Sequence, residues 1–225
     1  ASFVQPINDD HLEGAVDVSE YKAEGKDDVL YAFPETGDNG YVLFYNKSMI
    51  SEKEVGSLET IMEVCDKTGK NLVIDMKNGF YACMIPLTGG GTYELDSAGK
   101  QILNYDYEKI APVAKAFSGL FAGNDRLTND EDKVMASSMK NDKALGCVVG
   151  SWKTKAMRAA LGDNYAVAKL PTINVDGKDT QIISMFGYKM LGVNAKTKYQ
   201  VTAQSLAYYL SGEQCQKERI ESMEW

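Results

Sequence analysis

The sequence predicts a layered α/β fold with a largely parallel sheet. Short apolar runs typical of strands alternate with helix-like segments of roughly 10–15 residues. Some runs are apolar at nearly every position, which indicates strands buried on both faces; the clearest are 41–45 (YVLFY) and 144–149 (ALGCVV). The 225 residues are 44% hydrophobic and 25% charged, which allows a sizeable core in one large domain or two small ones.

Strand signals are separated by turn residues. A strand over 29–33 is expected to end at Pro34, and the turn-rich segment 35–40 then leads into the next apolar run. Asp176-Gly177 is the signal for a two-residue hairpin turn. The other segments with a strand pattern are 71–76, 144–149, 165–170 and one or two strands within 182–193.

Helical spacing of apolar residues marks the remaining segments. The clearest helix begins after Ser57, a candidate N-cap, and stops at Gly69, which suits the residue just past a helix end. Its apolar face is formed by Leu58, Ile61, Met62 and Cys65. The other expected helices are 80–87, 107–121, 129–140, a segment after Trp152 that ends at Leu161, 201–210 and 213–222.

The charge and hydropathy of the chain exclude several kinds of partner. The formal net charge of −8 argues against nucleic acid, because phosphates are neutralised by a basic surface, and against adsorption to an anionic membrane. No stretch approaches the ~20 apolar residues of a membrane span. Ala1 opens directly into mixed sequence, so no signal peptide is expected in this chain, as in a mature processed protein.

The sequence contains few of the residue patterns that enzymes use for catalysis. The single histidine, His11, is expected at the surface and argues against multi-histidine metal sites and histidine-based triads. The triplet 89–91 (GGG) is neither followed by Lys-Ser/Thr nor spaced as GxGxxG. We therefore expect a non-enzyme without cofactor or metal. Wide spacing predicts free thiols instead of zinc ligands for the four cysteines, Cys65, Cys83, Cys147 and Cys215. We interpret the methionines as core residues, among them Met84, Met135, Met139 and Met157.

A collinear series of segments resembles one protein family. Residues 31–47 (YAFPETGDNGYVLFYNK) are similar to the first crossover of the maltose-binding-protein-like family, in which a YxxP element precedes an apolar run ending in YNK or YDK. Residues 149–152 (VGSW) are similar to the family's "nGpW" loop. The other similar segments are 71–75 (NLVID), 80–90 (FYACMIPLTGG), 165–171 with the turn that follows, 183–194 and 203–213. Over about residues 29–222 the chain thus resembles bacterial extracellular (family 1) solute-binding proteins of ABC transporters.

The resemblance implies a periplasmic-binding-protein type II-like fold that is truncated relative to the two-lobe family, whose members are longer. It divides the chain into a partial first-lobe and crossover segment at 1–41, a second, C-terminal lobe at 42–182, and a returning strand with helices that pack with the first lobe at 183–225. In this family the two lobes close over a solute by a hinge motion.

The resemblance also implies a function without catalysis. The expected role is capture of a carbohydrate, in particular an oligosaccharide, and its delivery to ABC-transporter permease subunits. A monomer is expected, either as a cell-surface lipoprotein of a Gram-positive cell or in the periplasm. Any membrane attachment is then through a lipid anchor outside this chain.

Candidate sugar contacts follow from the segments that resemble the family. A sugar presents apolar C–H faces and many hydroxyls, so its site combines aromatic rings with polar side chains. Trp152 of the VGSW loop is the strongest candidate. The full set of candidates is Trp152, Asp38, Asn39, Tyr41, Asn78, Phe80, Tyr81, Phe186 and Tyr188.

Each candidate also has a structural explanation. Trp152 could be a core residue, like other large aromatic side chains, and the same holds for Phe80 and Tyr81. Asp38 and Asn39 could serve only a turn. Phe186 and Tyr188 are two residues apart in an expected strand, so they share one face, which is either the ligand face or the core face.

Two other classes of function compete with sugar capture. A non-catalytic α/β interaction domain that binds a protein or a non-sugar solute would expose a large apolar patch. A glycoside hydrolase would need two positioned carboxyl groups. The sequence nominates no such pair.

Overall fold

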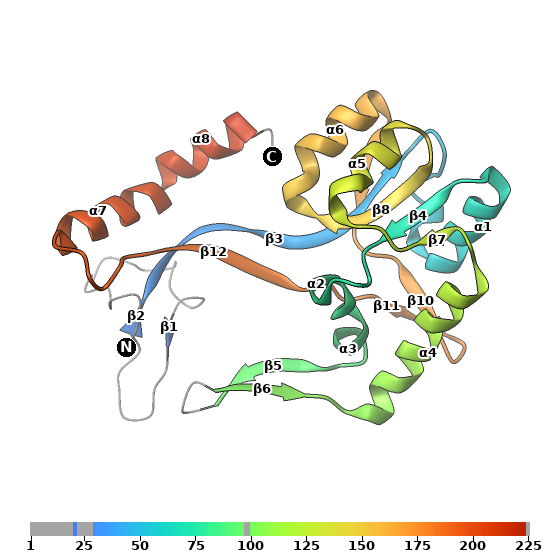
Figure 1. Cartoon of the computed structure of the whole chain (residues 1–225), viewed down its shortest axis with the longest axis horizontal. Coiled ribbons are helices and arrows are strands. Elements are labelled where there is room, and N and C mark those ends of the chain that lie inside the picture. The colour runs from blue at the N-terminus through green and yellow to red at the C-terminus, as the bar shows by residue number, and fades with distance from the viewer. Residues whose placement is uncertain (1–19, 22–28, 97–99, 224–225) are drawn as a thin grey trace. The chain divides into compact units, whose positions relative to one another are not determined.

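The computed structural model describes residues 20–21, 29–96 and 100–223 (Figure 1). Helices and strands alternate along these residues, so the α/β class predicted from the sequence is confirmed. In this part of the chain no helix is long and apolar enough to cross a membrane. The described residues fall into two compact units: unit 1 contains those within 1–39, 93–102 and 187–225, and unit 2 contains those within 40–92 and 103–186.

A six-stranded sheet is the main sheet of the fold. Its strand order is β12–β3–β8–β4–β7, and β9 also pairs with β3. β4 runs parallel to both β7 and β8, whereas β3 runs antiparallel to β8 and β9. The sheet is therefore parallel over β8–β4–β7, as predicted, and antiparallel around β3. The strands are β3 (Ala32–Asn46), β4 (Asn71–Ile74), β7 (Leu127–Thr128), β8 (Ala144–Gly150), β9 (Tyr165–Ala168) and β12 (Phe186–Gly192).

Helices cover the strands of unit 2. α5 packs against α6 and β8, and α1 packs against β4 (Figure 1). The helices of this unit are α1 (Leu58–Thr68), α2 (Gly79–Ala82), α3 (Met84–Thr88), α4 (Tyr107–Gly123), α5 (Asp132–Lys140) and α6 (Thr154–Leu161). Single 3₁₀ turns occur at Glu54–Gly56, Ser151–Lys153 and Gly162–Asn164.

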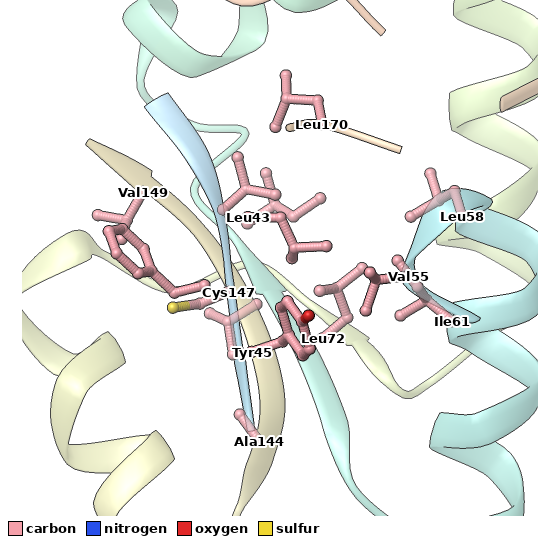
Figure 2. Close-up of a cluster of buried hydrophobic side chains, with 14 of the residues drawn as sticks. Leu43, Tyr45, Val55, Leu58, Ile61, Leu72, Ala144, Cys147, Val149 and Leu170 are labelled. Atoms are coloured by element: carbon pink, nitrogen blue, oxygen red, sulfur yellow. The ribbon is translucent and has the colours of Figure 1, made fainter. Parts of the chain in front are cut away.

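The hydrophobic core of unit 2 is built around β8. All seven residues of β8 are buried, which is the outcome expected for a run that is apolar at every position. Figure 2 shows that side chains of β3, β4 and α1, such as Leu43, Leu72 and Ile61, belong to the same cluster as Cys147 of this strand. Full burial of each such side chain stabilises the fold by about 1.5–3 kcal/mol. The buried methionines predicted as core residues belong to the same cluster: Met84, Met135, Met139 and Met157.

Several local signals in the sequence are confirmed. The Ser57 hydroxyl accepts a hydrogen bond from the Thr60 N–H at the start of α1, and Gly69 ends that helix with a φ of +69°. The hairpin of β10 (Thr172–Val175) and β11 (Lys178–Gln181) turns at Asp176 and Gly177, whose φ values are 50° and 86°. Positive φ at both central residues is the geometry that favours Asp-Gly in a two-residue turn.

The turn predicted for residues 35–40 is wrong, and so is the strand end predicted at Pro34. β2 (Val29–Leu30) is short, but β3 then continues from Ala32 to Asn46 without a break. The local turn preference of Asp and Asn is overridden because β3 pairs with β12 in the sheet. Gly40 suits this strand because a Cβ there would lie 3.1 Å from Phe186 Cδ2.

Other boundaries differ more modestly. The helix predicted over 80–87 is two short helices, α2 and α3, separated at Cys83. The strand predicted over 71–76 ends at Ile74. A hairpin of β5 (Thr92–Leu95) and β6 (Gln101–Asn104) and the short β7 had no counterpart among the expected elements. Within 182–193, only β12 is a strand.

The described residues of unit 1 contain less buried apolar surface. α7 (Gln200–Ser211) and α8 (Glu213–Met223) confirm the two helices predicted near the end of the sequence. The buried apolar cluster here consists of Phe33, Val193 and Ala207. β1 (Glu20–Tyr21) pairs with β2.

The four cysteines form no disulfide. Cys65, Cys83 and Cys147 are buried and Cys215 is partly exposed, and all four are free thiols in the structure. Burial raises the pKa of the Cys65, Cys83 and Cys147 thiols. The single histidine, His11, lies outside the described residues.

Candidate functional site

The candidate site of unit 2 lies where β4 and β8 end. These strands are parallel, so their carboxyl ends meet at the same edge of the sheet, where open α/β sheets usually bind ligands. The segment after β4 leads to Asn78 and Phe80, and the segment after β8 leads to Trp152. Two of the sequence segments that contain predicted sugar contacts are therefore brought to one edge.

Four aromatic rings form a cluster at this edge, named here the aromatic cluster: Tyr41, Phe80, Tyr81 and Trp152. Phe80 lies between the tyrosines and the tryptophan, with ring centroids 5.3 Å from Tyr41, 5.5 Å from Tyr81 and 5.8 Å from Trp152. The two tyrosine rings are 5.2 Å apart. The rings are tilted or edge-to-face, which is the arrangement that their quadrupoles favour.

The four rings differ in exposure. Tyr41 and Tyr81 are each 1% exposed, Phe80 is partly buried, and Trp152 is 36% exposed. The tyrosines can therefore support the cluster from below but present no ring face to a ligand. Trp152 is the ring that reaches the surface, so it is neither a fully buried core residue nor a loose surface residue.

Hydrogen bonds fix the loop that carries Trp152. The Gly150 N–H donates to Tyr81 Oη at 3.4 Å, and the Ser151 hydroxyl donates to the carbonyl oxygen of Gly40 at 3.3 Å. The Thr154 hydroxyl donates to the carbonyl oxygen of Ser151 at 2.7 Å. Contacts to β3 and α2 thus hold the loop, although its sequence neighbours are in β8 and α6.

Asn78 and Cys83 orient the Phe80 side of the cluster. Asn78 is the exposed N-cap of α2, and its side-chain oxygen accepts a hydrogen bond from the Phe80 N–H at 3.0 Å. Its amide NH₂ group can still donate to a ligand oxygen. The Cys83 thiol donates to the Phe80 carbonyl oxygen at 2.9 Å and lies 3.6 Å from Tyr41 Oη. Burial raises the pKa of this thiol, which makes it a structural group and a poor nucleophile.

The remaining predicted contacts lie on β3 and β12. Phe186 is 57% exposed in unit 2, and Tyr188 is 44% exposed in unit 1, on the same strand. Asn39 lies in the unit 1 part of β3, with its side-chain nitrogen 3.4 Å from the position of a Cβ on Gly187. The backbone of Asp38 is part of β3. The ring contacts of the aromatic cluster join Tyr41, Phe80, Tyr81 and Trp152 to one another.

Sequence reasoning missed the residues that support the cluster. Cys83 was expected only to be a free thiol, and Ser151 and Thr154 were not among the predicted site residues. Asp75 was also missed: it follows β4 directly and is only 6% exposed. A carboxylate at the end of an apolar strand run is the signal that could have nominated it. Within the described residues, no group of three or more His, Cys, Asp or Glu side chains could hold a metal ion.

An aromatic ring partly exposed at the carboxyl edge of an α/β sheet suits a protein that binds a solute. The sequence matches the family described as "Bacterial extracellular solute-binding protein" over residues 3–224. The chain therefore belongs to this family of bacterial solute-binding proteins.

Individual relatives are similar to the chain in sequence or in structure. The galactooligosaccharide-binding protein of Bacillus subtilis (strain 168) is 30% identical over 211 residues, which are 87% of this chain and 48% of the relative. A structure solved with acarbose is 29% identical with a TM-score of 0.80, over 97% of this chain and 57% of that one. The maltodextrin-binding protein MalE1 from L. casei BL23, solved without ligand, is 22% identical with a TM-score of 0.74, over 97% and 58% of the two chains. The chain thus spans about half the length of the curated relative that it matches.

Proposed function

We propose that the protein captures a carbohydrate, in particular an oligosaccharide, reversibly and without catalysis, for uptake by an ABC transporter. The observation that carries the proposal is the partly exposed Trp152 ring, supported by Phe80 and two buried tyrosines at the carboxyl edge of the sheet. An apolar sugar face packs against such a ring, and polar groups around it fix the orientation of the hydroxyls.

Each candidate has a proposed role. Trp152 stacks on a sugar ring, Phe80 extends the aromatic surface beside it, and the Asn78 amide donates to a sugar hydroxyl. Tyr41 and Tyr81 act through these rings, since both are buried. Further contacts to the ligand are proposed for the residues on β3 and β12: Asp38, Asn39, Phe186 and Tyr188.

The relatives support the carbohydrate class. One relative at 30% identity is named for binding galactooligosaccharide, and a structure at 29% identity was solved with acarbose. The expected partners are therefore an oligosaccharide and the permease subunits of the transporter. The expected place of action is outside the cell membrane, either in the periplasm or as a lipoprotein anchored at the cell surface. Within this scheme, unit 2 corresponds to the second lobe that the sequence predicts at 42–182.

Thermal unfolding with a panel of glycans tests the proposal. The panel contains maltodextrins, galactooligosaccharides and acarbose, with glutamate, spermidine and a tripeptide as non-sugar solutes. A glycan at 100 times its dissociation constant should stabilise the native state by about 2.7 kcal/mol, a shift of several degrees in melting temperature. No stabilisation by any glycan contradicts the proposal, and stabilisation by a non-sugar solute favours the alternative of a non-sugar binding domain.

The Trp152→Ala variant connects binding to the aromatic cluster. We expect its glycan affinity to fall at least tenfold, or about 1.4 kcal/mol, because the stacking face is lost. Tyr107→Ala is the matched control, since Tyr107 is an aromatic residue 81% exposed and outside the cluster. Equal affinities of the two variants in calorimetric titration would show that the site lies elsewhere.

A further inference from the structure

Gly150, the last residue of β8, lies directly against the Trp152 ring. A Cβ added to Gly150 would lie 2.2, 2.2 and 2.3 Å from Cη2, Cζ2 and Cζ3 of the indole. These three neighbouring atoms are nearly equidistant from that position, so the Cβ would enter the face of the six-membered ring instead of touching its edge. No residue larger than glycine fits here while the indole keeps its place.

The backbone at this position does not itself require glycine. Gly150 has φ −63° and ψ 147°, a region open to every L-residue. Gly69 is the opposite case, because its φ is +69° and a Cβ there would meet nothing within 4 Å. Glycine is therefore needed at position 150 because it leaves space for the Trp152 ring, and not because of its backbone conformation.

The loop cannot easily move to make that space. The Gly150 N–H is bonded to Tyr81 Oη, and the next residue, Ser151, is bonded to the Gly40 carbonyl oxygen. Across the strand pair, Gly150 is the register partner of Tyr41, which belongs to the aromatic cluster. A side chain at position 150 would therefore displace the partly exposed indole, whose atoms lie nearest to that side chain.

We infer that Gly150 is a positioning residue for the sugar ligand. The glycine backbone on one side and Phe80 on another hold the Trp152 indole in one orientation before a ligand arrives. A ring that is already ordered loses less conformational freedom on binding, so the affinity is higher. This inference rests on the proposed function, because it concerns the ring expected to stack on the sugar.

The test uses the Gly150→Ala variant in a chain with Trp225→Phe, which leaves Trp152 as the only tryptophan of the two in the sequence. Gly119→Ala is the matched control, because Gly119 lies in α4 and a Cβ there would meet nothing within 4 Å. For Gly150→Ala we expect stronger acrylamide quenching of Trp152 fluorescence and at least a tenfold loss of affinity for acarbose or galactooligosaccharides. Gly119→Ala should match the parent in both measurements.

A double-mutant cycle separates positioning from general damage to the loop. With Trp152→Ala present, the added Gly150→Ala change should leave glycan affinity unchanged, because the ring that it displaces is gone. An equal loss of affinity with and without the ring would overturn the inference, as would quenching in Gly150→Ala equal to that in the control. If the parent binds no glycan, the proposed function fails, and the quenching comparison alone then decides whether Gly150 sets the position of the ring.

Discussion

Cys65 shows how one buried side chain ties stability to pH. It lies in α1 with no exposed surface, and burial, aided by the nearby Asp66 charge, raises the pKa of its thiol from 9.0 to about 12. Between these two values the unfolded chain releases the thiol proton while the native chain keeps it. The contribution of this thiol to the free energy of unfolding is therefore fully present below pH 9 and is lost as the pH rises toward 12.

The Cys65→Ala variant tests this linkage. At pH 7 we expect the variant to be less stable than the parent, because buried contacts are lost. From pH 9 upward the gap should narrow, with a limiting slope of about 1.4 kcal/mol per pH unit, since only the parent still carries the Cys65 thiol. Urea unfolding under reducing conditions from pH 7 to pH 10.5 measures the gap. A gap that stays constant over this range would show that the native thiol titrates normally.

For individual residues, the sequence predicted which side chains are buried. It was less informative about which side chains hold the aromatic cluster in place. The buried cysteines and methionines were predictable because their neighbours are apolar. Trp152 was nominated through its loop motif. The positions of Tyr41 and Tyr81 beneath the surface were not predictable, because they depend on β3 meeting α2 some forty residues later in the chain. The close approach of the Trp152 ring to Gly150 was likewise not predictable, because it depends on the folded position of the indole.

At the scale of elements, we expect alanine at two helix glycines to change the free energy of unfolding in opposite directions. Gly69 ends α1 at φ +69°, so Gly69→Ala should lower the free energy of unfolding by about 1 kcal/mol. Gly119 lies exposed inside α4 in open space, so Gly119→Ala should raise it by about 0.5–1 kcal/mol. Urea unfolding of both variants measures the two signs. A Gly69→Ala variant as stable as the parent would show that the positive φ at the end of α1 does not limit its stability, and a less stable Gly119→Ala variant would contradict the expectation for α4.

Elements defined by local chemistry were predictable, and those defined by pairing were not. The cap of α1 and the turn at Asp176 and Gly177 depend on neighbouring residues, and both are confirmed. The stretch 35–40 carries the same kind of turn residues, yet it is part of a fifteen-residue strand. The difference is the partner strand β12, which lies about 150 residues away in the sequence and leaves no local signal.

At the scale of the whole molecule, buried apolar surface is unevenly shared between the units. The cluster around β8 in unit 2 includes side chains from several strands and helices, whereas the described cluster of unit 1 contains Phe33, Val193 and Ala207. Helices α1 and α7 make the contrast quantitative. α1 has eleven residues, of which five are buried, and α7 has twelve, of which only Ala207 is buried.

Native-state hydrogen exchange should reveal this difference. The two helices are nearly equal in length, so their intrinsic tendency to open is similar, and tertiary burial decides their protection. We expect amides of α7 to exchange through local opening that costs at least about 2 kcal/mol less than the opening of α1, given the additional side chains that α1 buries. Amides of β4 and β8 should exchange only through global unfolding. Equal protection of α7 and α1 would contradict the expectation, and would mean that exposed residues of α7 such as Val201 and Tyr209 are covered in solution.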